Sequence, residues 1–287
     1  MNRITPKHLI MALITAILVT GQLRYGILKG WTPLLLCLGG AVLAEALLSS
    51  FMLGRMTPLS SAYVSGTSLT LLLKPEPGLI WPFLVGAALS IGSKYVLRYR
   101  GKHLWNPTNF GIAALLLVAP GKIAILSHEF GNDVTTNAVI WIIGLLIASR
   151  AKILHVTFTY VAAFLAFAWL RTLLNGQSFV TEVTPLTGPM YQLFVFFMVT
   201  DPATTVATKR GRIFVAVLVA AGESLLRTGN DLGWAWAAPF APAPAIFALA
   251  IVGPIALAVR LAALGEFKRP GGQANQTAAP RIASASA

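Results

Sequence analysis

The sequence predicts an all-α, polytopic membrane protein with about ten transmembrane segments in two repeats. Of the 287 residues, 56% are hydrophobic and only 11% are charged, a balance typical of multi-span membrane proteins and of no soluble class. Apolar runs follow one another along the chain, and the basic residues lie between them. Two short apolar runs, each stopped by proline, also occur at matching places in the two halves.

Ten apolar runs define a single membrane domain over residues 1–266. Several are shorter than the ~20 residues that a straight helical span requires, so we expect short, interrupted helices among them. The polar residues 267–287 show no periodicity and cannot bury enough apolar area to order themselves, so we predict a disordered cytoplasmic tail there. The runs lie at 9–28, 33–54, 62–73, 79–97, 107–119, 134–149, 153–174, 189–200, 213–227 and 241–263.

Basic residues in the short loops set the predicted orientation. The net charge of +13 could suggest a nucleic-acid partner, but lysines and arginines between apolar runs are better explained by the positive-inside rule. With ten crossings and both termini inside, 16 of the 22 basic residues fall on the cytoplasmic side. We therefore expect a bacterial-type inner (cytoplasmic) membrane, both termini in the cytoplasm and the 175–188 loop outside. No small-residue cleavage site follows the first run, so we expect that run to be retained.

Two short stretches carry the signal for an internal repeat. Residues 65–77 read SGTSLTLLLKPEP, and residues 194–212 read FVFFMVTDPATTVATKRGR. Each is a threonine-containing apolar run stopped by proline, and each is followed by an apolar span that ends at a basic residue, Arg98 or Arg227. Interrupted helices at matching places in two halves point to a binding site near the membrane midplane. We therefore predict half-repeats of roughly 1–130 and 131–266.

Polar side chains at these matched breaks are the candidates for ligand binding. Such groups are costly in lipid unless they face protein, water or a ligand, so we expect them near the interface between the halves. The alternative is an ordinary helix end at the Asp201-Pro202 step, whose polar groups only cap the chain. The candidates are Thr67, Thr70, Asn106, Asn109, Asp201 and Thr204.

Two acidic residues inside apolar runs are candidates for coupling to a proton or a cation. An ionisable side chain at that depth marks a functional site by default. Glu223 has Arg227 four residues later, so a simple helical ion pair is an equal alternative. Glu45 has no basic residue within a helical turn, which favours a proton or cation site.

Common metal and nucleotide motifs are not recognisable in the sequence. The four histidines form no helical pair, and the single cysteine, Cys37, lies in an apolar run, where a small apolar filler is its simplest role. Neither a Walker loop nor a GxSxG nucleophile motif occurs. We therefore name no metal ligand and no catalytic residue.

Three motifs resemble one family of membrane redox subunits. The run FFMVTDPATT…KRGR is similar to the family's FFMATDPxT…GR signature, and WNPTNFG resembles its NPxNPA motif. The stretch beginning GTSLTLLLKPEP resembles its TxLLLxLxLPP…W…K segment. The family contains the D subunit of Rnf-type electron transport complexes and the B subunit of the sodium-translocating NADH:quinone oxidoreductase. The resemblance implies ten membrane helices in two inverted repeats, an architecture related to that of urea transporters. It also implies other membrane redox subunits as partners.

The resemblance further implies a flavin cofactor. In the family, FMN is esterified to a threonine on the outer side, and some members also hold riboflavin. Thr184, followed by Pro185-Leu186, matches the end of that attachment motif, but Glu182 and Val183 replace two small residues and the motif's aspartate is absent. We therefore expect most of the protein to carry no covalent flavin. The hydroxyls of the same loop offer a noncovalent site instead, through Thr181, Thr184 and Thr187.

The leading functional prediction is a flavin-dependent membrane electron-transport subunit that works beside partner redox subunits. A subunit of this kind is part of a larger complex rather than a stand-alone enzyme. One alternative is a carrier or channel for a small solute or ion, which would use the same repeat fold without a redox centre. The other is a scaffold subunit that only anchors partners.

Overall fold

The chain forms an almost entirely helical structure, which is a computed structural model describing residues 6–28, 30–125 and 134–263. Five of the described helices are long and apolar enough to cross a membrane, so the chain is an all-α, multi-pass membrane protein. The predicted tail at 267–287 lies outside the described residues. The five are α1 (Pro6–Tyr25), α2 (Thr32–Leu53), α7 (Leu154–Asn175), α10 (Lys209–Asp231) and α11 (Pro244–Ala263).

Shorter helices occupy the remaining predicted runs, so each of the ten runs contains a helix. A π-helical turn, η2 (Phe194–Met198), extends the short helix α9, and such turns often lie at functional sites. The number of crossings stays a prediction. The shorter helices in these runs are α3 (Ser60–Leu72), α4 (Trp81–Val96), α5 (Pro107–Val118), α6 (Val134–Arg150) and α9 (Pro189–Leu193). Helix α8 (Phe179–Val183) and the 3-10 turns η1 (Thr184–Thr187) and η3 (Ala238–Phe240) lie between the runs.

Capping side chains explain where two of the helices begin. The side chain of Asn106 accepts a hydrogen bond from the backbone N–H of Asn109 at 3.1 Å, and Pro107 then fits the first position of α5. Thr208 caps α10 in the same way, accepting from the N–H of Gly211 at 3.2 Å. The polar residues Asn106 and Thr208 therefore act as caps of α5 and α10.

Two small antiparallel sheets, which were not predicted from the sequence, lie in the segments between helices. Strand β1 (Leu73–Pro75), directly after α3, pairs with β4 (Ile123–Ile125), which follows α5. Strands β2 (Arg98–Tyr99) and β3 (Lys102–His103) form a hairpin between α4 and α5. The β1–β4 pairing satisfies backbone groups that the short helices leave free, which matters where water is excluded.

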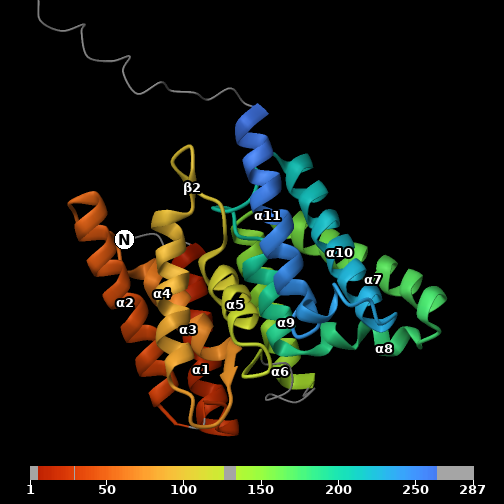
Figure 1. Ribbon diagram of the computed structural model, residues 1–287, viewed down its shortest axis with the longest axis horizontal. Coiled ribbons are helices and arrows are strands. Elements are labelled where there is room, and N and C mark those ends of the chain that lie inside the picture. The colour runs from red at the N-terminus through yellow and green to blue at the C-terminus, as the bar shows by residue number, and fades with distance from the viewer. Residues whose placement is uncertain (1–5, 29, 126–133, 264–287) are drawn as a thin grey trace, which may run out of the picture.

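The two halves of the chain show the same order of helix packing. In the first half α2 packs against α3 and α4, and α4 packs against α5; in the second, α7 packs against α10, and α10 against α11. Helices α5 and α11 meet across the halves, as do α1 and α6. In Figure 1 the first-half helices, red to yellow, lie beside the second-half helices, green to blue. This order favours the predicted repeat, which stays a prediction.

Close helix approach in the first half depends on two glycines. A Cβ added to Gly66 of α3 would lie 2.8 Å from the Cα of Leu38 in α2. A Cβ added to Gly111 of α5 would lie 2.9 Å from the backbone oxygen of Gly86 in α4. Small residues let membrane helices approach closely enough for dense van der Waals contact. These contacts fix the position of α3 and α5, which carry the first polar break.

Candidate functional site

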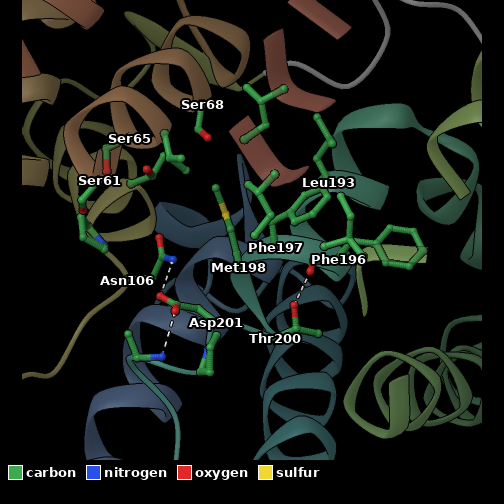
Figure 2. A pocket seen from close by; sticks show the side chains of 18 of the residues that line it. Ser61, Ser65, Ser68, Asn106, Leu193, Phe196, Phe197, Met198, Thr200 and Asp201 are labelled. Atoms are coloured by element: carbon green, nitrogen blue, oxygen red, sulfur yellow. Dashed lines mark hydrogen bonds between the residues drawn. The ribbon is translucent and has the colours of Figure 1, made fainter. Parts of the chain in front are cut away.

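A cavity of about 590 Å³ lies between α3, η2 and the turn that precedes α5. We call it the Asn106 cavity, and Figure 2 shows its lining. Its walls are mostly apolar, from Phe196, Phe197 and Met198 among others, and the polar side chains that line it include Asn106 and Asp201. A mostly apolar pocket with a few placed polar groups is the usual form of a small-molecule site.

Asn106 and Asp201 join the two halves of the chain at this cavity. The Nδ2 of Asn106 donates to Oδ2 of Asp201 at 3.0 Å, and both residues line the cavity (Figure 2). Asp201 is held in turn by the hydroxyl of Thr204, at 3.0 Å from the same oxygen, and by the N–H of Ala203, at 3.0 Å from Oδ1. Two residues predicted from distant segments, Asn106 and Asp201, are thus in contact at the cavity. Thr204 supports Asp201 without lining the cavity itself.

The other three candidates from the sequence do not line this cavity. Asn109 is buried and donates from Nδ2 to the backbone oxygen of Ile246 at 3.1 Å, which links α5 to α11. Thr67 and Thr70 donate their hydroxyls to backbone oxygens of their own helix, one turn earlier, at 2.7 and 2.8 Å. The hydroxyls of Thr67 and Thr70 are thus already engaged within α3. A role of these three residues in ligand binding stays a prediction.

A row of serines on α3 lines the Asn106 cavity where the threonines do not. Ser61, Ser65 and Ser68 lie on one helical face, with spacings of four and three residues. Sequence reasoning followed the threonines of the same helix and missed this face. The spacing of the serines was the available signal.

His103 also lines the Asn106 cavity, from the β2–β3 hairpin. Burial lowers the pKa of His103; Asp201 opposes that shift, whereas Lys94 and Arg98 add to it. The imidazole is therefore biased toward its neutral form, which can both donate and accept a hydrogen bond.

A second cavity, of about 490 Å³, lies under the loop that carries Thr184. We call it the Thr184 cavity. Thr181, Thr184 and Gly188 line it from that loop, and Tyr191 and Arg227 line it from α9 and α10. The hydroxyl of Thr184 donates to the backbone oxygen of Val180 at 2.8 Å. Thr184 therefore faces a cavity, as expected of a ligand-binding residue, while its hydroxyl is engaged by its own helix. Thr187 is not among the lining residues.

A buried ion pair holds the Thr184 loop in place. Arg171 of α7, only 1% exposed, donates from Nε to Oε2 of Glu182 at 2.6 Å, and Asn175 donates to Oε1 at 2.7 Å. Burial by itself raises the pKa of Glu182, but the hydrogen bonds and charges from these partners outweigh it and lower the pKa below 4.5. Glu182, one of the departures from the resembled motif, is therefore a structural anchor of the loop.

The two cavities share part of their wall. Leu72, the last residue of α3, and Met198, the last residue of η2, line both of them. Figure 2 shows Met198 beside Asn106 and Phe197 at the Asn106 cavity. Ligands in the two cavities would therefore be separated by these two apolar side chains.

Glu223 has no exposed surface and lies in a cluster of hydroxyls and a cation. Arg227 donates from Nε to Oε1 at 2.8 Å, which is the helical ion pair that the sequence offered as an alternative. The hydroxyl of Tyr191 donates to both carboxylate oxygens at 2.6 Å, and that of Tyr160 donates to Oε2. The two tyrosines come from α9 and α7 and could not be paired with Glu223 from sequence.

Glu45 also has a cation partner, which comes from another helix. The Nζ of Lys94 in α4 lies 2.5 Å from Oε2, and the hydroxyls of Thr57 and Tyr95 donate to Oε1 at 2.8 and 2.9 Å. No residue of this cluster lines either of the two cavities. The role of Glu45 as a proton or cation site stays a prediction.

Comparison with known proteins gives one partial similarity. No family model matches the chain. A segment is 35% identical over 74 residues to the D subunit of an ion-translocating oxidoreductase complex from Erwinia tasmaniensis. The segment covers 26% of this chain and 21% of that protein, so the match spans about a fifth of the relative's length.

Proposed function

We propose that the chain is a membrane electron-transport subunit that binds flavin noncovalently and works beside other redox subunits. The observation that carries this proposal is the pair of cavities with a common wall at Leu72 and Met198. The partial likeness to an oxidoreductase subunit and the motif resemblance add support. Two ligands that contact the same apolar side chains are close enough for electron exchange.

The Asn106 cavity fits a flavin by the chemistry of its lining. A flavin ring has apolar faces and a polar edge of carbonyl and N–H groups. The faces suit Phe196, Phe197 and Met198, and the edge suits the amide of Asn106 and the carboxylate of Asp201. A bound flavin would supply electron transfer, while these residues orient it, exclude water and tune its potential.

The Thr184 cavity fits a second flavin through its loop hydroxyls and Arg227. Covalent attachment is disfavoured because the Thr184 hydroxyl is hydrogen-bonded to the backbone oxygen of Val180 and the preceding residue, Val183, is bulky.

We also propose the orientation of the chain: a bacterial-type inner membrane, with both termini in the cytoplasm and the 175–188 loop outside. In the Cys37→Ser background, a Gln177→Cys variant should react with an impermeant thiol reagent from outside only.

The visible spectrum of the purified full-length protein tests the proposal. We expect the absorbance bands of oxidised flavin, with the flavin released into the supernatant on acid precipitation. A flavin-free protein that retains its helical content would contradict the proposal.

A second candidate function, a carrier or channel for a small solute, is favoured by the same shared wall. Two cavities divided by Leu72 and Met198 would form one path with an apolar barrier. Under this alternative, replacing both residues by alanine should make vesicles permeable to small solutes, and no flavin should be bound. A tight vesicle with the double variant would exclude it.

A further inference from the structure

Arg227 and Tyr191 connect the fully buried carboxylate of Glu223 to the Thr184 cavity. Arg227 binds Oε1 of Glu223 through Nε and Nη2, both at 2.8 Å. The same side chain is 23% exposed and lines the cavity, whereas Glu223 is 0% exposed and does not. The guanidinium is therefore positioned to be shared between the carboxylate and an anion in the cavity.

Hydrogen bonding in this cluster leaves room for one more proton. The hydroxyl oxygens of Tyr160 and Tyr191 lie 2.8 Å apart; Tyr160 also contacts Oε2 of Glu223, and Tyr191 contacts both carboxylate oxygens. An ionised carboxylate has no proton to donate, so only the two hydroxyl protons serve these four oxygen–oxygen contacts. A protonated carboxyl would supply a third proton, and each of the three groups could then donate once.

We propose that Glu223, Tyr160 and Tyr191 form a proton-binding site that takes up one proton when the ligand of the Thr184 cavity gains a negative charge. The inference rests on the proposed function, which places a redox ligand there. With a neutral ligand, Arg227 is paired with Glu223 and compensates its charge. A negative charge in the cavity attracts the guanidinium and leaves the carboxylate less compensated. Because an uncompensated buried charge is costly, the carboxylate binds a proton.

Charge and atoms balance in this step. One electron enters the cavity from a one-electron donor, and one proton from solvent forms an O–H bond with a carboxylate oxygen of Glu223. No bond of the protein breaks, and the net charge of the site is unchanged. Burying an electron without a compensating proton would be unfavourable at low dielectric, so the cluster lowers the cost of reducing the ligand.

The charged and titratable groups around Glu223 are compatible with this role. Tyr160 approaches from α7, Tyr191 from α9 and Arg227 from its own helix α10, while Phe194 of η2 packs its ring against both tyrosines. Glu182 of α8 also interacts electrostatically with Arg227, but its carboxylate is already paired with the buried Arg171 of α7. Arg227 is therefore the cation that a ligand in the cavity can draw away.

Infrared difference spectroscopy on the full-length protein loaded with FMN tests the proposal. The reduced-minus-oxidised spectrum should gain one carboxylic-acid C=O band. That band should be lost in Glu223→Gln and should persist in Glu45→Gln, the matched buried carboxylate that lies away from both cavities. Tyr191→Phe should shift the band, because the protonated carboxyl then has one partner fewer.

Two results would overturn the proposal. Reduction of bound FMN without a carboxyl band, or with a band that survives in Glu223→Gln, would leave the flavin function standing and refute the proton site. If FMN does not bind, the proposed function fails, and inorganic phosphate added to the flavin-free protein supplies the negative charge instead. The same band with the same variant dependence is then expected, and its absence would refute the proton site as well.

Discussion

The two buried carboxylates of this protein have similar partners and differ in what their cations touch. Glu45 is paired with Lys94 and Glu223 with Arg227, and hydroxyl groups donate to both carboxylates. Lys94 joins two helices of the first half and lines neither cavity, whereas Arg227 lines the Thr184 cavity. The difference shows which of the two ion pairs a bound ligand can perturb directly: the one whose cation also borders a cavity.

Removing the two cations should give the largest effect. Breaking a buried ion pair by removing one partner costs about 3–5 kcal/mol, because the remaining charge is left uncompensated. We expect Arg227→Met to reach this range, since Glu223 has no exposed surface. Lys94→Met should reach the same range, because Glu45 is only 2% exposed. Unfolding titrations in detergent measure both, and a loss well below about 3 kcal/mol for either variant would contradict a buried ion pair at that site.

Substitution at the Asn106–Asp201 contact should give the next largest effect. Each side chain offers hydrogen bonds worth about 1–3 kcal/mol when their loss leaves a buried partner unsatisfied. Asp201→Ala should therefore weaken riboflavin binding about 10- to 100-fold by fluorescence titration. Thr67→Val should change it by less than about threefold, because that hydroxyl binds only its own helix. Equal effects of the two variants would remove Asp201 from the binding site.

A pH dependence of intermediate size should report on Glu182. Its folded pKa lies below 4.5, so its stabilising contribution is complete above 4.5 and is lost as pH falls through the folded pKa. Limited proteolysis of the 175–188 loop should therefore accelerate as the pH falls below about 4.5. In Glu182→Gln that acid-dependent step should be missing. A wild-type loop that stays equally protected at acid pH would contradict the anchoring role.

Thr184→Ala should give the smallest effect. When the wild-type protein is co-expressed with a flavin transferase, we expect no ultraviolet-fluorescent band on a denaturing gel, and none in the variant. Noncovalent FMN affinity should fall by less than about fivefold, because the hydroxyl already serves Val180. A fluorescent band in the wild type that Thr184→Ala abolishes would show covalent attachment after all.

Much of the fold follows from the order of apolar residues, whereas the site depends on contacts between distant segments. Helix positions could be predicted because a bilayer imposes one kind of backbone on every apolar run. The partners of Glu45 could not, since Lys94 is 49 residues away and belongs to another helix. The β1–β4 pairing was also hidden, because three-residue strands carry no measurable alternation.

The candidate site was predicted where polar residues interrupt apolar runs and missed where they fit a helical face. Asn106 and Asp201 stand at prolines, so their position at a break could be read directly. Ser65 and its neighbours on α3 are compatible with an ordinary helix, so nothing but their spacing distinguished them from Thr67. Which face of a short helix borders a cavity is decided by packing against α1 and α2, and that information is not local.

The flavin content of the purified full-length chain is the most direct test of its proposed function. Acid extraction of wild-type protein, Asp201→Ala and Lys209→Ala, followed by separation of riboflavin from FMN, gives the moles of each per mole of chain. We predict noncovalent flavin in the wild type, retained in Lys209→Ala and reduced in Asp201→Ala. A correctly folded wild-type protein without flavin, or equal flavin in all three, would contradict the assignment of the Asn106 cavity.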